Sequence, residues 1–290
     1  MFFRPYLLPI ISIMVATLLS FSVAADISTT PGQGMETIIL ENASDVSSAV
    51  TELKYELEQQ GFIIALTVNH SAAAASVGLK LAPNQVIFAR PPKNLEKKLL
   101  RKSETIGLDL PLKFQVFESS NGSINLSVNT LGYLIDRHEV SIRDFVLRMT
   151  DKLIEQFNTT PEKGHGLVSV ESLLSVEDTV QALQDAISVN PAVRIPLVLD
   201  YGKNRNSFPV LIVFGNPNVG TLLMQADPRM GIDLPLKFLV WKGKHGQVKI
   251  TYTDPHFSAG RVNLQGQDGR LDAIAKSLNK LAMIGAGKNP

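Results

Sequence analysis

Histidine is the residue type in this chain that could most directly carry acid–base or metal chemistry, because its ordinary pKa of about 6.5 lies close to neutral pH. The 290 residues include five histidines, and His70 and His138 are far enough apart in sequence to meet only through the fold. Two imidazoles with Asp136 or Asn69 could bind a metal or move protons, and with Arg137 they could hold a small ligand. We therefore expect a ligand site around His70, Arg137 and His138 that changes charge near pH 6.5. The alternative is three unrelated surface or core residues.

The segment around Asn216 is a second candidate. Asn216 followed by Pro217 is a preferred pair at the start of a helix, so this loop could simply begin a short helix through residues 222–224. Alternatively, the backbone amides near Asn216, Asn218 and Gly220 could bind an anion at the helix N-terminus. No lysine follows in the manner of a nucleotide-binding P-loop, so nucleotide hydrolysis is not indicated.

A pair of opposite charges recurs on either side of a proline. Asp109 lies four residues before Lys113, and Asp233 lies four residues before Lys237. We interpret both as surface ion pairs, which contribute little to stability. A basic cluster is interpreted as a solvated helix face, with docking to an acidic partner or anionic lipid headgroups as the alternative. The cluster comprises Lys93, Lys97, Lys98, Arg101 and Lys102.

The composition limits the classes of function. Hydrophobic residues make up 44% of the chain and charged residues 19%, which favours a folded globular protein. The 28 basic residues nearly balance the 27 acidic residues, so there is no general positive field to hold nucleic acid. The lack of cysteine excludes disulfides, thiolate nucleophiles and cysteine-ligated metal centres. We expect no cofactor and no nucleic-acid partner.

Residues 1–24 have the pattern of a cleaved signal peptide. Arg4 precedes an apolar run from Leu7 to Leu19, and small residues suit cleavage after Ala24 or Ala25. An uncleaved anchor is the alternative, but the purely apolar stretch falls short of the roughly 20 residues that a spanning helix needs. We expect a periplasmic or secreted protein that keeps no stable membrane anchor after cleavage.

The elements that must position these residues occur twice. Gly107–Val116 and Gly231–Val240 are identical at eight of ten positions, at an offset of 124 residues. Upstream of each, apolar residues recur at the spacing of one helix face, and Ser175 is placed to cap the second of these helices. The two faces are Val46, Val50, Leu53 and Leu57, and Val176, Val180, Leu183 and Ile187.

Short apolar or alternating runs predict four strands in each copy, the last two joined as a hairpin by a glycine turn. A closing helix follows in each copy, with an apolar face over the sheet. The order strand, helix, several strands, helix in each copy predicts an α+β fold of two mostly antiparallel sheets, each with helices on one face, packed as a pseudo-dimer. The predicted strands are 62–68, 86–89, 112–117 and 124–128, then 195–199, 210–214, 236–241 and 248–252; the closing faces are Ile142, Val146, Met149 and Leu153, and Leu271, Ile274, Leu278 and Leu281.

The predicted domains are therefore 26–157 and 167–290, joined by a Thr-, Pro- and Gly-containing linker at 158–166. The chain resembles the family called domain of unknown function 302 in three places: the segment 214–224, the Asp-Leu-Pro-Leu-Lys sequence of both copies, and Tyr252 with the Asp-Pro pair behind it. The resemblance implies a compact α+β domain similar to half of a TATA-box-binding protein, here without the basic nucleic-acid face.

The same resemblance implies that each copy keeps part of one ancestral site. The first copy keeps Asn69-His70 and Arg137-His138, but its Gly-Asn-Pro loop has become Ala89–Pro92. The second copy keeps the loop at 215–217 and has Tyr201 and Val262 at the histidine positions.

We favour a non-enzymatic, exported binding or interaction protein, with a site for a small ligand where the unequal copies meet, or with an envelope protein as partner. One alternative is a small-molecule hydrolase or isomerase that uses His70 and His138 as acid and base, although no complete catalytic constellation is present. Another alternative is a structural envelope protein. The ligand and any bound metal are left open.

Overall fold

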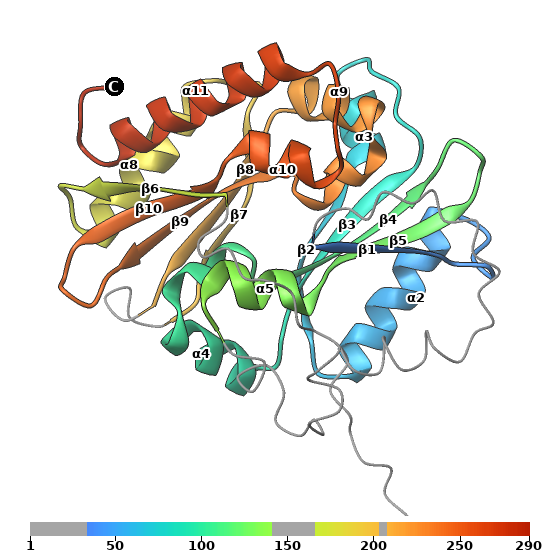
Figure 1. Ribbon diagram of the computed structural model, residues 1–290, viewed down its shortest axis with the longest axis horizontal. Coiled ribbons are helices and arrows are strands. Elements are labelled where there is room, and N and C mark those ends of the chain that lie inside the picture. Colours follow the sequence, from blue (N-terminus) through green and yellow to red (C-terminus); the bar gives the residue numbers. More distant parts are fainter. Residues whose placement is uncertain (1–33, 141–165, 203–207) are drawn as a thin grey trace, which may run out of the picture.

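The computed structural model describes residues 34–140, 166–202 and 208–290 (Figure 1). Three predicted features lie outside these residues: the signal peptide, nearly all of the 158–166 linker, and the closing helix of the first copy. The described chain forms two five-stranded antiparallel sheets with associated helices, which confirms the α+β fold of two similar halves.

The first half contains a sheet whose strands lie in the order β1-β5-β4-β3-β2. Every neighbouring pair is antiparallel, and the register is interrupted between Ile64 and Leu66, where β2 pairs with β3. The elements are β1 (Met35–Ile39), α2 (Val46–Gln59), β2 (Ile63–Asn69), α3 (His70–Ala75), β3 (Asn84–Arg90), α4 (Lys93–Lys102), η1 (Glu104–Leu108), β4 (Leu112–Glu118), β5 (Ile124–Asn129) and α5 (Leu131–His138).

The second half repeats this plan in the order β6-β10-β9-β8-β7, again antiparallel throughout. A long C-terminal helix closes it. The elements are β6 (Leu167–Ser172), α8 (Val176–Ser188), β7 (Arg194–Asp200), β8 (Val210–Gly215), α9 (Pro217–Ala226), η3 (Pro228–Ile232), β9 (Leu236–Lys242), β10 (Val248–Thr253), α10 (Pro255–Arg261) and α11 (Asp268–Gly285).

Local sequence signals explain where these elements begin and turn. The side chain of Asp45 accepts a hydrogen bond from the amide of Ser48 at the start of α2, and Ser175 caps α8 in the same way, as predicted. Gly122 and Gly246 take positive φ angles of 83° and 90° in the two predicted hairpin turns, a conformation that glycine adopts without steric cost.

The structure adds to and corrects the expected elements. The strand that precedes the first helix of each half, predicted without bounds, is β1 in one half and β6 in the other; each is short and pairs at one edge of its sheet. His70 does not extend the preceding strand. β2 ends at Asn69, whose side chain accepts a hydrogen bond from the amide of Ala72, so His70 is the first residue of α3.

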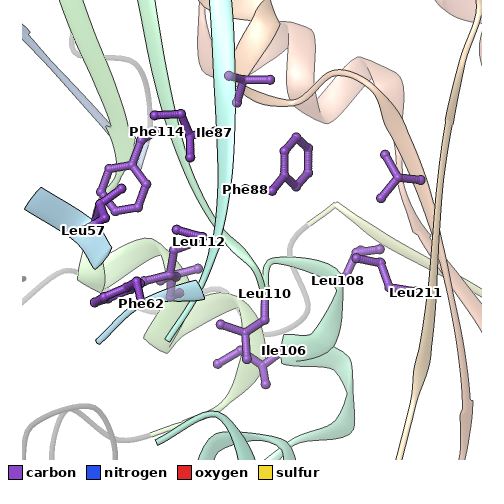
Figure 2. Close-up of a cluster of buried hydrophobic side chains, with 14 of the residues drawn as sticks. Leu57, Phe62, Ile87, Phe88, Ile106, Leu108, Leu110, Leu112, Phe114 and Leu211 are labelled. Atoms are coloured by element: carbon purple, nitrogen blue, oxygen red, sulfur yellow. The ribbon is translucent and has the colours of Figure 1, made fainter. Parts of the chain in front are cut away.

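Each sheet has an outer face covered by its own helices and an inner face turned toward the other half. In Figure 1, α2 lies against the first sheet and α8 with α11 against the second. On the inner side, η1 of the first half packs on β9, and η3 of the second half packs on β4. Leu211 of the second sheet accordingly joins the same buried cluster as Ile106 and Leu108 (Figure 2). The two halves therefore share a core.

Candidate binding site at the interface of the two copies

The repeated Asp and Lys residues lie inside the protein, at the interface between the halves. Asp109 and Asp233 end the short helices η1 and η3, and Lys113 and Lys237 follow on β4 and β9. The exposed fractions are 1% for Asp109, 3% for Lys113 and 5% for Lys237. The expectation of surface ion pairs was wrong, because each pair faces the opposite half rather than solvent.

The ion pairs cross the interface. The Lys113 ammonium lies 3.0 Å from the Asp233 carboxylate of the other half, closer than the 3.4 Å to Asp109 of its own half. Asp233 also accepts a 2.7 Å hydrogen bond from Arg261, and Asp109 lies 3.5 Å from Arg137. A buried carboxylate needs such partners, because its charge is otherwise costly to remove from water.

The two arginines exchange partners between the copies. Arg137 of α5 donates a 2.7 Å hydrogen bond to the hydroxyl of Thr253, at the end of β10. Arg261 of α10 donates a 2.6 Å hydrogen bond to Asn129, at the end of β5. Residues 137 and 261, like residues 129 and 253, differ by the repeat offset of 124, so the contacts are reciprocal about a pseudo-twofold axis.

Aromatic rings cover this pair of arginines. Tyr133 and Phe257, again equivalent by the repeat offset, stack with ring centroids 6.3 Å apart. The Arg261 guanidinium lies 4.2 Å from the centre of the Tyr133 ring, and the Arg137 guanidinium lies 5.2 Å from the centre of the Phe257 ring. The Tyr133 hydroxyl also accepts a hydrogen bond from Arg137. Cation–π contacts of this kind stabilise cations that are removed from water.

His138 belongs to this cluster but is fully occupied there. Its Nε2 lies 2.8 Å from the Asp109 carboxylate and its Nδ1 lies 3.1 Å from the Thr105 hydroxyl. Burial lowers the pKa of His138 and outweighs the opposing effect of Asp109. The imidazole is therefore neutral at pH 7 and positions Asp109.

His70 lies apart from Arg137 and His138. Its Nε2 is 3.2 Å from the backbone carbonyl of Gly231 in the other half. Tyr201 makes the reciprocal contact, its hydroxyl donating to the carbonyl of Gly107 at 2.8 Å and also contacting that of Leu110. Burial lowers the pKa of His70 to about 4, so the expected change of charge near pH 6.5 is wrong for this residue. Of the three predicted residues, the structure brings Arg137 and His138 together at Asp109.

The electrostatics of the cluster favour the charged form of the carboxylates and disfavour the charged form of one lysine. Burial alone would raise the pKa of Asp233, but Arg261 and Lys113 outweigh it and hold that pKa far below the usual range. Burial, reinforced by the neighbouring Lys113 ammonium, holds the pKa of Lys237 well below its ordinary value. Lys237 makes no ion pair with any carboxylate in the described part of the chain.

A small cavity adjoins this lysine. Its volume is ≈ 20 Å³, and Asp233, Lys237 and Thr253 provide polar lining. The remaining lining is mostly apolar and comes from α9, η3, α10, α11 and the start of β9 with the segment before it. A cavity of roughly 10–15 Å³ by this measure is enough for one water molecule, so a guest of that size fits.

Asn216 and Gly220 lie in a different place and have local roles. The Asn216 side chain accepts a 3.0 Å hydrogen bond from the Asn218 amide and caps α9, as the structural reading of this loop predicts. A Cβ at Gly220 would lie 3.4 Å from Leu234, so this glycine packs closely on the segment before β9. Anion binding by this helix start stays a prediction.

Within the described ranges 34–140, 166–202 and 208–290, no group of three or more His, Asp and Glu side chains is arranged to hold a metal ion. Nor do those same ranges contain a helix with the length and apolar character required to cross a membrane.

The sequence pointed to Asp109, Lys113, Asp233 and Lys237 as surface ion pairs rather than as one buried cluster, and it did not single out Arg261. A usable signal was present. The offset of 124 that aligns the two Asp-Leu-Pro-Leu-Lys segments also aligns Arg137 with Arg261, which marks an arginine kept in both copies.

The fold and this reciprocal interface define a class of protein in which two copies of one α+β domain are joined in a single chain. The sequence matches DUF302, a domain of unknown function, over residues 38–157 and 197–283. The chain belongs to this family as a tandem of two copies.

Two curated relatives carry the name fluoride-specific ion channel FluC 1. The protein from Brucella suis biovar 1 (strain 1330) is 36% identical over 132 residues, which are 42% of this chain and 50% of the relative. The protein from Brucella abortus biovar 1 (strain 9-941) has the same identity over 132 residues, 42% of this chain and 47% of the relative. The chain thus spans about half the length of these relatives.

A solved structure, that of an uncharacterized conserved DUF302 protein from Bacillus stearothermophilus, is also similar. The match has a TM-score of 0.37 and 16% sequence identity, and it covers 41% of this chain and 97% of the other.

Proposed function

We propose that the chain is an exported, non-enzymatic binding protein whose two copies hold a small inorganic anion at their shared polar interface. The observation that carries this proposal is the charge content of the buried cluster. Two lysines and two arginines surround two carboxylates in the described part of the chain, and one of the lysines, Lys237, lies in no ion pair. A charged lysine at this buried position would lack a counter-ion, and a bound anion would supply one.

The relatives support the same ligand class. Their printed name, fluoride-specific ion channel, concerns a small anion, and this chain matches about half of their length. A role in binding or handling such an anion outside the cytoplasm is consistent with that match and with the signal-peptide pattern of residues 1–24.

The arrangement of the histidines argues against the acid–base alternative. His138 uses both ring nitrogens inside the cluster, and His70 is directed to the Gly231 carbonyl. A general acid and base need to reach one reacting group together, within about 3 Å each. These two imidazoles have separate partners: His70 contacts the second half, whereas both partners of His138 belong to the first half.

Thermal unfolding of the full mature chain in a series of sodium salts tests the proposal. At constant ionic strength, a bound anion stabilises the folded state by about 2.7 kcal/mol when its concentration is 100 times the dissociation constant. We expect one anion class to raise the melting temperature and native mass spectrometry to detect the bound ion. Equal melting temperatures across the series, with no ion detected, would contradict anion binding and favour a structural envelope protein.

Export is tested separately by N-terminal sequencing of the protein from its natural compartment. The proposal expects a mature chain that begins at Ala25 or Asp26. A chain that begins at Met1 on membrane-bound protein would contradict export without affecting anion binding.

A further inference from the structure

The interface cluster is not symmetric, because one of its two equivalent lysines forms ion pairs with carboxylates and the other does not. Lys113 lies within 3.4 Å of both carboxylates, Asp109 and Asp233. Its repeat equivalent Lys237 forms an ion pair with neither and is hydrogen-bonded to Lys113 instead, although both carboxylates lie near enough to act on its charge. His138 contacts Asp109 in the first copy. The equivalent residue in the second copy is Val262, whose side chain has no polar group.

The ≈ 20 Å³ cavity is lined in part by Lys237. The Asp233 carboxylate on its wall would repel an anion, but Arg261 and Lys113 already hold that carboxylate at 2.7 and 3.0 Å. The Thr253 hydroxyl accepts a hydrogen bond from Arg137, so its own hydrogen remains available to donate. The volume of the cavity limits a bound guest to about the size of one water molecule. Phosphate and sulfate, with four oxygens each, are too large for it.

The geometry points to this cavity as the site of one compact inorganic anion of the size of fluoride, taken up together with one proton that resides on Lys237. The inference rests on the proposed function and specifies its ligand and its coupling. The step is an ion-pair formation with no covalent change: the neutral amine gains a proton from solvent, and the anion becomes the counter-ion of the resulting ammonium.

The groups that face Lys237 explain why a proton accompanies the anion. Without the anion, burial and the Lys113 ammonium disfavour a second positive charge here, and the effects of Asp109 and Asp233 do not compensate. Arg261 is hydrogen-bonded to Asp233, and the Tyr133 hydroxyl, whose pKa is raised by burial, stays neutral. An anion in the cavity supplies the missing negative charge, so binding and protonation must favour each other reciprocally.

Isothermal titration calorimetry with sodium fluoride on the full mature chain tests the inference. Repeating the titration in buffers of different ionisation enthalpy counts the protons taken up. We expect uptake of about one proton per fluoride, and an affinity that falls about tenfold for each pH unit above the pKa of Lys237 in the free protein. Sodium sulfate at equal ionic strength should give no binding.

Variants on one strand make the test specific. Lys237→Met should abolish fluoride binding, whereas Lys242→Met, an exposed lysine on the same strand β9, should keep the wild-type affinity and proton count. Fluoride binding that survives Lys237→Met, or that proceeds without proton uptake, would overturn the inference while leaving an anion-binding function intact. Sulfate binding as tight as fluoride binding would overturn the assignment to the cavity.

The wild-type measurements decide the case even where Lys237→Met does not fold. Fluoride binding with one proton and exclusion of sulfate supports the inference. Absence of binding by any anion in the series contradicts both the inference and the proposed function.

Discussion

The two copies hold equivalent carboxylates in unequal surroundings. Asp109 is bonded to His138 at 2.8 Å and lies within 3.5 Å of Lys113 and Arg137. Asp233 is held by Arg261 and by the Lys113 of the other copy. The first copy thus keeps three partners around its carboxylate, whereas the second keeps two. Both halves contain the carboxylate and the lysine. The difference at one position, His138 in the first copy and Val262 in the second, gives Asp109 one more polar partner than Asp233.

The inner faces of the two sheets also differ between the copies, one being more polar than the other. Gln115 and Asn84 of the first sheet donate hydrogen bonds to the Pro228 carbonyl of the second half. The position equivalent to Gln115 by the repeat offset is Leu239, which packs instead against Gly107. At this pair of equivalent positions, the first half therefore contacts its partner by hydrogen bonds and the second half does so by apolar packing.

The largest expected effect follows from removing the carboxylate that joins the halves. Asp233→Asn removes the carboxylate that accepts a hydrogen bond from Arg261 and leaves Lys113 with only the more distant Asp109. Breaking a buried ion pair by removing one partner costs about 3–5 kcal/mol. Urea unfolding at pH 7 should show a loss of this size; a loss under about 1 kcal/mol would mean that the cluster does not bind the halves together.

A smaller loss of stability is expected at acidic pH, and it arises from His70 of the first copy. The pKa of His70 is about 4 in the folded chain and about 6.5 when unfolded. Between these values the unfolded state binds more protons, so stability falls as the pH is lowered from 6.5 toward 4. The contribution of His70 between pH 7 and pH 5 is roughly 2 kcal/mol.

Urea unfolding of the wild type and of His70→Gln at both pH values measures this contribution. The buried His138 adds a loss of the same sign, so both proteins should lose stability and the variant should lose less. Identical losses would show that His70 is accessible to protons in the folded state.

Much of the fold could be predicted from sequence, because the Gly107–Val116 segment recurs in the second copy. Its offset matches the predicted strands of one copy with those of the other. The interface could not be predicted in the same way. Asp109 and Lys113 are four residues apart, which suggested a local surface pair, yet the closer carboxylate to Lys113 is 120 residues away. A contact between copies leaves no spacing signal within either copy, and only the conserved offset of Arg137 and Arg261 indicated it.

The smallest expected effect compares the two glycines at which the halves approach most closely. A Cβ on Gly231 would meet the amide of Gln115 and, at 2.9 Å, the oxygen of Asn84, two side chains fixed by hydrogen bonds. A Cβ on Gly107 would meet the end of the Leu239 side chain at 2.9 Å, which can move more readily. Overpacking costs depend on how far neighbours can give way, so Gly231→Ala should cost about 1 kcal/mol more than Gly107→Ala.

Thermal unfolding of the two single variants beside the wild type provides the measurement. Equal costs would imply that the polar and apolar inner faces are equally rigid, and the contrast between the copies would then be limited to the charged cluster.

The claim that the two copies form one cooperative unit is tested most directly by expressing residues 26–157 and 167–290 separately and measuring their unfolding alone and mixed. Each half alone would expose its inner face and leave buried charges without the partners that cross the interface, such as Lys113 with Asp233. We expect each half to be much less stable than the full chain and to regain stability when the two are mixed. Halves that each unfold at the midpoint of the full chain, with no affinity for one another, would contradict the account.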